Sequence, residues 1–311
     1  MTSKVHWGSV LPAFLTRGGA VAPARAEQYR FAPILPGERQ VVRCDVILPY
    51  CATNARWALA AAESILNQAF AEPVVHLIAD GGARIEDRAL KEALSGVDCC
   101  RWYRTRKRLG PYRITNNLFE YLETDYFAVQ DADDLSAPNR LWRSVRVLED
   151  DGYDIFGGAM EQFVDYHQPR ERMLAALART PYQIPGARWR KTPRGAIIHG
   201  GMTCRKACFE RLGGYGAFVC GGDCEFISRA HAAGARIFVS HQIVGWRRLH
   251  EDSLSSSMSS RLQPHEQFSR EEAKRRFAEW QQDGCDLKSH GCLERYRAGG
   301  ELVRLHPNAS D

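Results

Sequence analysis

Short apolar runs alternate with segments of helical spacing through most of the chain. Apolar runs that end at proline, glycine or acidic residues predict strands near residues 44–49, 73–79, 99–104, 126–131, 154–158 and 237–240. Apolar residues at helical spacing predict helices near residues 54–70, 114–122, 141–148, 206–212 and 223–234, with another that ends at about residue 94. This alternation predicts an α/β fold, in which helices cover both faces of a mostly parallel sheet.

Polar residues follow three of the predicted strands at the point where each strand ends. Pro49 and Tyr50 end the first strand, and Asp80 with two glycines follows the second. Asp131 to Asp134 end the strand near residues 126–131. Ligands of an open α/β sheet bind outside the carboxyl ends of its strands. We therefore expect these segments to share one rim and to form the binding site.

The third of these segments contains three acidic residues within four positions. Residues 126–134, YFAVQDADD, predict a buried strand that ends in Asp131, Asp133 and Asp134. Such a cluster has to be solvated, protonated or bound to a cation. Carboxylate ligands favour a hard divalent ion such as Mg²⁺ or Mn²⁺. The alternative is a solvated turn before a helix near Pro138, with Ser136 as its N-cap.

Composition is that of an ordinary globular protein. The 311 residues are 44% hydrophobic and 25% charged, with a net charge of +5 that permits an acidic partner without arguing for one. No stretch approaches the roughly 20 apolar residues that span a bilayer. The ten cysteines show no disulfide framework and are typical of reduced thiols, which predicts a cytoplasmic protein. Two C-x3-C pairs offer zinc as a minor alternative: Cys204 with Cys208, and Cys220 with Cys224.

Three parts follow one another along the chain. Residues 1–42 show no clear period and are predicted to be an N-terminal arm. Residues 43–255 hold the α/β domain, and residues 256–311 form a C-terminal helical extension. Within the extension, residues 267–282 predict a basic amphipathic helix that docks on the domain.

The order and spacing of several motifs indicate a known family. These are Val46 to Tyr50, Glu63 to Gln68, Asp80-Gly81, Gly110 with Asn116, Asp131 to Asp134, Leu212 to Tyr215, Gly222 to Phe226, and Arg248 to His250 followed by Ser253 and Ser255. Over about residues 43–255 the chain resembles the family 2 glycosyltransferases, which have the GT-A fold and use nucleotide-sugar donors. Each motif alone is weak, whereas the ordered set is specific.

The resemblance implies a donor site and a metal site. Asp131 would face the ribose and the metal, Asp133 would coordinate the metal, and His250 would complete the site. Imidazole favours Mn²⁺, with Mg²⁺ as the alternative. The metal would stabilise the charge of the leaving diphosphate.

The same resemblance implies contacts to the nucleotide. Asp80 would accept hydrogen bonds from the base, expected to be uracil in a UDP-sugar. Pro49 and Tyr50 would line that pocket, and Asn116 would belong to the donor site. The alternative for Asp80 is a simple Asp-Gly turn.

Asp223 is the expected general base, because it matches the second residue of the family's acidic pair and would start a helix. The family usually has glutamate where this chain has Gly222, so Glu225 is the second candidate for the base. With one base and no evident nucleophile, we expect a single displacement with inversion.

Other functions compete with this interpretation. A sugar nucleotidyltransferase would need a glycine-rich phosphate loop, which is missing after the first strand. The basic run Arg101 to Arg113 fits a nucleic-acid surface, a loop near the donor diphosphate, or a solvated face. Gly222 keeps a non-catalytic relative open. The expected acceptor is a hydroxyl of a bacterial glycan or glycoconjugate, with nucleic acid, peptide or natural product as alternatives.

Overall fold

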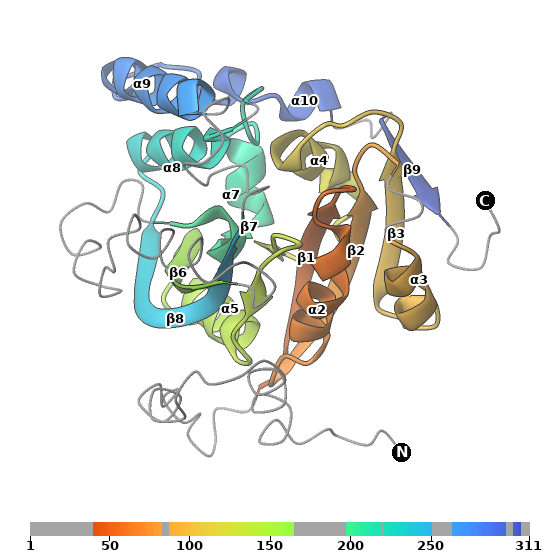
Figure 1. Cartoon of the computed structure of the whole chain (residues 1–311). Helices are drawn as coiled ribbons and strands as arrows, with labels where there is room; N and C mark the ends of the chain where they lie inside the picture. The colour runs from red at the N-terminus through yellow and green to blue at the C-terminus, as the bar shows by residue number, and fades with distance from the viewer. Residues whose placement is uncertain are drawn as a thin grey trace.

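The computed structural model describes residues 40–82, 87–164, 197–218, 220–250, 263–296 and 301–305. Most of the predicted N-terminal arm, and Ser253 and Ser255 of the last motif, lie outside this part of the chain. Within it, the strands form one sheet in the order β5-β8-β6-β7-β4-β1-β2-β3-β9 (Figure 1). The strands are β1 Val42–Tyr50, β2 Ala71–Ala79, β3 Cys100–Thr105, β4 Tyr126–Val129, β5 Leu135–Ser136, β6 Ile155–Val164, β7 Thr203–Arg205, β8 Ile237–Leu249 and β9 Leu302–Leu305.

Helices connect most of these strands. They are α2 Ala55–Leu66, α3 Arg88–Leu94, α4 Pro111–Leu118, α5 Arg140–Asp150, α7 Lys206–Arg211, α8 Gly222–Ala232, α9 Gln263–Trp280 and α10 Leu293–Tyr296, with short 3-10 turns η3 Phe119–Tyr121, η4 His199–Gly201 and η5 Leu287–His290. None of the helices in the described ranges is long and apolar enough to cross a bilayer.

The centre of the sheet is parallel and its flanks are mixed. β4, β1, β2 and β3 are parallel neighbours, and β8 runs parallel to β6. β7 is antiparallel to both β4 and β6, and β9 is antiparallel to β3. The predicted α/β class is confirmed, as a mixed sheet with a parallel core.

Two apolar clusters cover the two faces of the sheet. Along β1, Val46 and Leu48 pack into the cluster under α2, α3 and α5. Ile47 points the other way, into the cluster formed with α4, α7 and α8. This alternation follows from the period of two in a strand and confirms helices on both faces.

Two sequence expectations change where tertiary pairing intervenes. Ser136 does not cap a helix: it lies in β5, and Asn139 is the N-cap of α5. Ser136 pairs with Gly245 of β8, and its backbone N–H donates to Ser64 Oγ on α2 at 3.0 Å. The strand expected at residues 237–240 continues to Leu249, because the more polar residues that follow pair with β6.

The C-terminal extension contributes more than a helix. β9 pairs with β3 and thereby covers that edge of the parallel sheet. α9 packs along α8, and α10 contacts α4 (Figure 1). Sequence analysis did not predict β9, because its four residues, LVRL, are too few to show a period.

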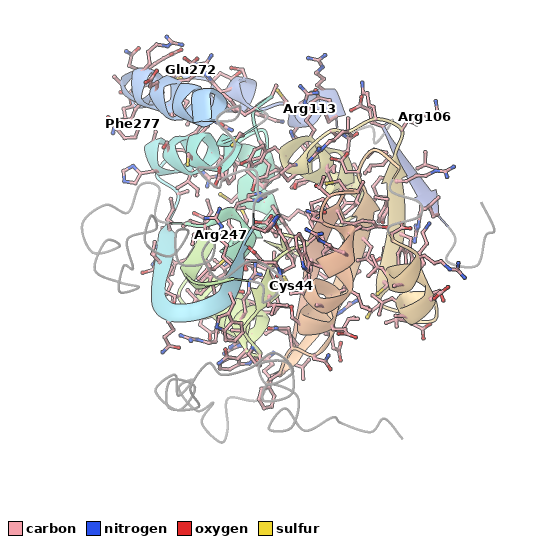
Figure 2. The ribbon with its side chains drawn as sticks, in the orientation of Figure 1. Cys44, Arg106, Arg113, Arg247, Glu272 and Phe277 are labelled. Carbon is pink, nitrogen blue, oxygen red and sulfur yellow. The ribbon has the colours of Figure 1, made fainter. Side chains whose placement is uncertain are left out.

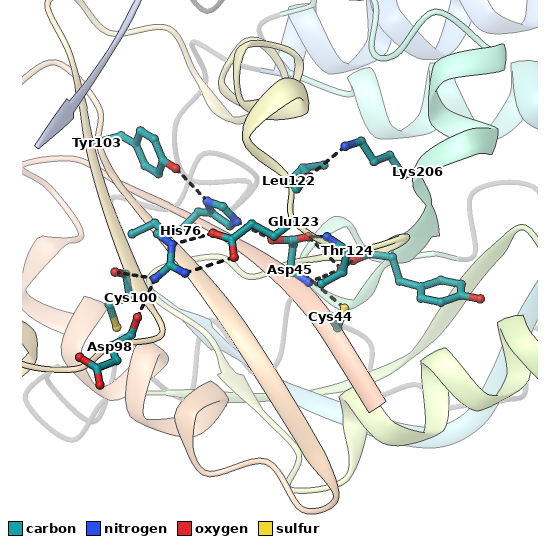
Figure 3. Close-up of polar contacts among 12 residues, drawn as sticks. Cys44, Asp45, His76, Asp98, Cys100, Tyr103, Leu122, Glu123, Thr124 and Lys206 are labelled. Atoms are coloured by element: carbon teal, nitrogen blue, oxygen red, sulfur yellow. Dashed lines mark hydrogen bonds and ion pairs between the residues drawn. The ribbon is translucent and has the colours of Figure 1, made fainter. Parts of the chain in front are cut away.

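A buried polar chain ties the parallel strands together below the rim. Asp45 Oδ1 lies 2.6 Å from His76 Nε2, and His76 Nδ1 lies 3.3 Å from the Tyr103 hydroxyl (Figure 3). Thr124 completes the chain, since its N–H and hydroxyl both donate to Asp45 Oδ2. β1, β2 and β3 therefore share polar as well as apolar contacts, and these fix the strands whose ends carry the candidate site.

Candidate active site

The parallel strands deliver three of the predicted segments to one edge of the sheet. β1 pairs in register with β2 from Val42 to Tyr50, so Tyr50 lies opposite Ala79. On its other side β1 pairs with β4, where Ile47 lies opposite Val129. The residues that follow these strands therefore begin at the same rim, as the sequence predicted.

Asp80 holds the loop between β3 and α4. Its Oδ1 accepts hydrogen bonds from the Thr105 hydroxyl at 2.9 Å and the Leu109 N–H at 2.7 Å. Its Oδ2 accepts from the Gly110 N–H at 2.9 Å. A carboxylate offers about four acceptor sites, so one further donor from a nucleobase is compatible with this arrangement. Its role in base recognition stays a prediction.

Pro49 and Tyr50 end up in different environments. Pro49 is half-buried at the rim. The Tyr50 side chain is 1% exposed and packs in the core cluster under α2, where its hydroxyl donates to Asp87 Oδ2 at 2.8 Å. Neighbouring strand residues point to opposite faces, which separates the two side chains. The structure thus places Tyr50 in the core instead of along a pocket.

Asn116 is fully buried on α4. Its amide nitrogen donates to the Tyr215 carbonyl at 2.9 Å, and its Oδ1 accepts from the Tyr215 N–H at 3.0 Å. The side chain therefore fastens the turn after α7 to α4. In this structure Asn116 positions backbone and does not face the rim.

A buried scaffold holds the acidic turn in place. Gln130 Nε2 donates to the carbonyls of Asp131 and Asp134 at 2.9 and 3.0 Å. The guanidinium of Arg140, from the first turn of α5, donates to Gln130 Oε1 and to the Val129 carbonyl. Sequence analysis missed this pair, although Arg140 follows the acidic run by only six residues.

The electrostatics of the turn differ between neighbouring carboxylates. Asp134 is buried, and burial together with Asp131 and Asp133 raises its pKa well above the ordinary value. Burial also acts to raise the pKa of Asp131, but His199, with Arg247 and Arg140, lowers it below its ordinary value. Adjacent carboxylates thus favour different protonation states, as expected for a crowded anionic site.

The end of β8 folds onto this turn. His250 Nε2 lies 2.7 Å from Asp133 Oδ2. The Arg248 N–H donates to Asp134 Oδ1 at 2.9 Å, and Arg248 Nε donates to the Asp133 carbonyl at 3.0 Å. The Trp57 ring lies 4.4 Å from the imidazole of His250. The structure thus joins His250 to Asp133, one of the two predicted carboxylate ligands of the metal.

Asp131 faces a different partner. Its Oδ1 lies 3.6 Å from Nδ1 of His199 in η4, and its side chain is 34% exposed. A compact metal-binding group would have three ligand atoms within 4.8 Å of one another. In the described part of the chain, Glu279, Cys285 and His290 meet this condition, and Asp131, Asp133 and His250 do not. The structure brings two predicted ligands together and turns the third toward His199.

The donor set nevertheless suits a divalent cation. Two carboxylates and an imidazole are compatible with Mn²⁺. Asp134 Oδ2 is buried without a hydrogen-bond partner. Oxygens of Asp131 and Asp134 lie 2.7 and 3.4 Å from the position that a Cβ on Gly200 would occupy, so glycine there makes room for both carboxylates. A divalent cation would add positive charge where three carboxylates lie close together and one carboxylate oxygen has no hydrogen-bond partner.

The two candidates for the general base have distinct surroundings. Asp223 lies in the first turn of α8 and is half-buried, and its Oδ1 accepts a hydrogen bond from the Tyr112 hydroxyl at 2.9 Å. Glu225 is fully buried in a two-point ion pair with Arg229 at 2.7 and 3.0 Å. That arginine also donates to carbonyls of the turn after α7. Through these contacts Glu225 helps to hold the turn after α7, and Asp223 remains the candidate for the general base.

The basic run has no aromatic platform. Trp102 and Tyr103 are buried in the core, and Arg101 pairs with Glu123 at 2.6 Å. Arg106 and its two cationic neighbours are exposed at the end of β3 (Figure 2). Tyr112, the third aromatic residue of the run, is buried as well. The stacking of bases that a nucleic-acid surface would use is therefore not available to these aromatic residues.

The cysteines are free thiols, as the sequence predicted. Cys204 and Cys208 are buried, and Cys220 and Cys224 are half-buried near the start of α8. In the described part of the chain no metal-ligand group contains them. The minor zinc alternative thus has no support in this geometry.

Taken together, an α/β sheet with an acidic turn at its rim, a histidine joined to that turn, and a carboxylate at a facing helix start define a GT-A type of site. The model of glycosyl transferase family 2 matches residues 45–213, more than half of the chain. The chain belongs to this family.

Individual relatives are distant, and each match covers only part of the relative. The putative glycosyltransferase EpsE of Bacillus subtilis (strain 168) is 32% identical over 113 residues, which are 36% of this chain and 37% of EpsE. The structure of S. aureus TarS 1-349 in complex with UDP-GlcNAc has a TM-score of 0.57 at 16% identity, covering 76% of this chain and 66% of that one.

A second solved structure has the same fold. The mannosyltransferase PcManGT from Pyrobaculum calidifontis, in complex with GDP-Man and Mn²⁺, has a TM-score of 0.52 at 18% identity and covers 74% of this chain and 64% of its own. At these identities the two structures establish the GT-A-like fold alone. The chain spans about two thirds of the solved relatives and just over a third of EpsE.

Proposed function

We propose that this protein is a metal-dependent, inverting glycosyltransferase. It moves a sugar from a nucleotide-sugar donor, expected to be a UDP-sugar, to an acceptor hydroxyl. The supporting observation is one continuous series of contacts across the site. Asp131 meets His199 at 3.6 Å, the His199 ring lies 5.1 Å from the Tyr112 ring, and the Tyr112 hydroxyl binds Asp223 at 2.9 Å. Packed side chains therefore join the proposed donor side to the proposed base side.

The proposed metal ligands and the proposed base have different chemical roles. Asp131, Asp133 and His250 would hold the cation, which supplies Lewis-acid stabilisation of the diphosphate as it leaves. Asp223 takes the proton from the acceptor hydroxyl as this oxygen attacks the anomeric carbon. The attacking oxygen forms its bond on the face opposite the breaking bond to the phosphate oxygen, so the anomeric configuration inverts.

The relatives support the donor class. UDP-GlcNAc is bound to TarS and GDP-Man with Mn²⁺ is bound to PcManGT, which fits a nucleotide-sugar and a manganese ion for this chain. We infer Mn²⁺ over Mg²⁺ because one of the three proposed ligands is an imidazole. We take the acceptor to be a hydroxyl of a bacterial glycan, since the aromatic residues of the basic run are buried and a nucleic acid has no stacking surface there. Ten free thiols fit a cytoplasmic location.

Donor hydrolysis tests this function. The protein is incubated with Mn²⁺ and UDP-, GDP- and dTDP-sugars, and released nucleotide is measured with and without EDTA. We expect slow, metal-dependent turnover of one donor, reduced at least about a hundredfold in both Asp133→Ala and Asp223→Asn. Asp151→Asn, at an exposed acid just after α5, is the matched control and keeps wild-type turnover.

The two variants separate the two roles. Asp133→Ala should also weaken Mn²⁺ binding in calorimetry, whereas Asp223→Asn should bind metal and donor as the wild type does. Absence of both turnover and metal-dependent nucleotide binding for all donors would refute the proposed function.

A further inference from the structure

Gly222 lies against the ring of a buried tyrosine. A Cβ atom added at Gly222 would meet three ring carbons of Tyr112, at 2.9, 3.0 and 3.1 Å. Contacts of this length require something to shift. The position where this chain departs from the family's usual acidic pair is therefore also the position where a side chain and Tyr112 exclude each other.

The ring has little freedom to move away. Tyr112 is 6% exposed and packs between His199 and Tyr215, with ring centroids 5.1 Å from each. The helix that carries Tyr112 is held at its start, because the N–H of Gly110, the N-cap of α4, donates to Asp80 Oδ2. A larger residue at 222 would thus act on a packed aromatic ring instead of a flexible chain end.

The ring also carries a hydroxyl to the candidate base. The Tyr112 hydroxyl donates to Asp223 Oδ1 at 2.9 Å, across 111 residues of sequence. Burial, with Asp223 close by, raises the pKa of Tyr112 well above its ordinary value, so the hydroxyl keeps its proton and stays a donor. The hydrogen bond fixes one carboxylate oxygen and the direction of the other.

We propose that Tyr112 is the positioning residue for Asp223, and that Gly222 is required because the tyrosine ring occupies the volume beside the base. This inference rests on the proposed function. Tyr112 takes no proton from the substrate; it orients the carboxylate that does. The Asp223 carboxylate thus receives a hydrogen bond from a neutral hydroxyl, and a second acidic side chain at position 222 would have no room beside the Tyr112 ring.

Several titratable groups surround the Tyr112–Asp223 pair. They are His199 from η4, Tyr215 from the turn after α7, Asp131 after β4, Cys220 just before α8, and Cys224 and Glu225 on α8 itself. Glu225 is committed to Arg229, and His199 faces Asp131. Tyr112 is therefore the neutral group that the structure joins directly to Asp223 by a hydrogen bond.

Kinetics test the positioning role. Tyr112→Phe keeps the ring and removes the donor, so we expect kcat to fall about ten- to a hundredfold with little change in the KM for the donor sugar. This split between kcat and KM distinguishes positioning of the base from a general loss of structure, which would also change donor binding. Tyr103→Phe removes a buried hydroxyl that lies 3.3 Å from His76, away from the site, and should keep both kcat and KM.

A thermal cycle tests the packing claim without any activity. Gly222→Ala should lower Tm by about 3–10 °C, although alanine is the better helix former. In a Tyr112→Ala background, the same change should be neutral or stabilising, because the obstructing ring is gone. Gly96→Ala, where an added Cβ meets nothing within 4 Å, is the control and should leave Tm unchanged.

The outcomes separate this inference from the proposed function. It is overturned if Tyr112→Phe keeps the wild-type kcat, or if Gly222→Ala costs the same in both backgrounds. If the wild type turns over no donor, the proposed function fails, and the thermal cycle alone then decides whether residues 112 and 222 are coupled.

Discussion

Replacing Arg140 by methionine tests how the acidic turn is held. Arg140 is 1% exposed, and its guanidinium donates four hydrogen bonds, to Gln130 Oε1, Ser136 Oγ and the carbonyls of Val129 and Met202. Burial lowers its pKa to about 10, so the side chain is still charged at neutral pH. It is the cation at the base of the turn that carries the three carboxylates.

The cost follows from which partners lose their donor. Ser136 Oγ still donates to Gln130 Oε1 at 2.6 Å, and the Met202 carbonyl still accepts from the Val129 N–H at 3.0 Å. The Val129 carbonyl loses the charged donor at 2.6 Å, and the acidic turn loses its buried counter-charge. Hydrogen bonds to charged groups contribute about 1.5–3 kcal/mol each, and breaking a buried charged network costs about 3–5 kcal/mol. We expect Arg140→Met to lower the free energy of unfolding by about 3–4 kcal/mol.

Urea denaturation, followed by circular dichroism, measures this loss. Arg146→Met is the matched control on the same helix. Arg146 is partly exposed and contacts surface side chains, two acids and Gln40, so its replacement should lose less than about 1 kcal/mol. Equal losses in the two variants would refute the reasoning. We also expect Arg140→Met to weaken Mn²⁺ binding even where the protein remains folded, since the turn loses its support.

Three further predictions concern other parts of the molecule. Gly213→Ala should cost about 2–4 kcal/mol in urea denaturation, because φ is +71° there and a Cβ would run into the Lys288 carbonyl of the C-terminal loop; a loss below about 1 kcal/mol would contradict this. Asp45→Ala should lower the free energy of unfolding by about 3–5 kcal/mol, since it breaks the fully buried contact between Asp45 and His76. A near-neutral effect would show that this contact does not stabilise the strands. The hydrogen bond from Cys100 lowers the pKa of Cys99 to about 7, so alkylation of Cys99 followed by mass spectrometry should accelerate through pH 7; a midpoint near pH 9 would be inconsistent with that contact.

The acidic turn shows how far sequence reasoning reached. The apolar run before Asp131 predicted a buried strand, and β4 confirms it. The rule for open α/β sheets then placed the carboxylates at the rim. The alternative interpretation, a turn with Ser136 as helix cap, was wrong about Ser136, because this residue lies in a short strand that pairs with β8.

Side-chain direction was harder to predict than backbone position. Tyr50 and Asn116 both belong to motifs of the expected donor site, yet the first lies in the core and the second bonds the backbone of Tyr215. Motif spacing locates a residue along an element. Which way its side chain points depends on the register of the sheet and on the packing of the neighbouring helix.

By itself, the sequence determined the alternation of strands and helices, the acidic end of β4 and the carboxylate at the start of α8. These features are local, since they depend on periodicity and on residues close together in the chain. The family resemblance assigned His250 and Asp133 to one site, but only the tertiary structure shows that the two side chains touch across 117 residues, and only it reveals that Tyr112 meets Asp223 across 111. Such pairs depend on strand order, register and packing, which bring distant segments within hydrogen-bonding distance and leave no periodic trace in the sequence.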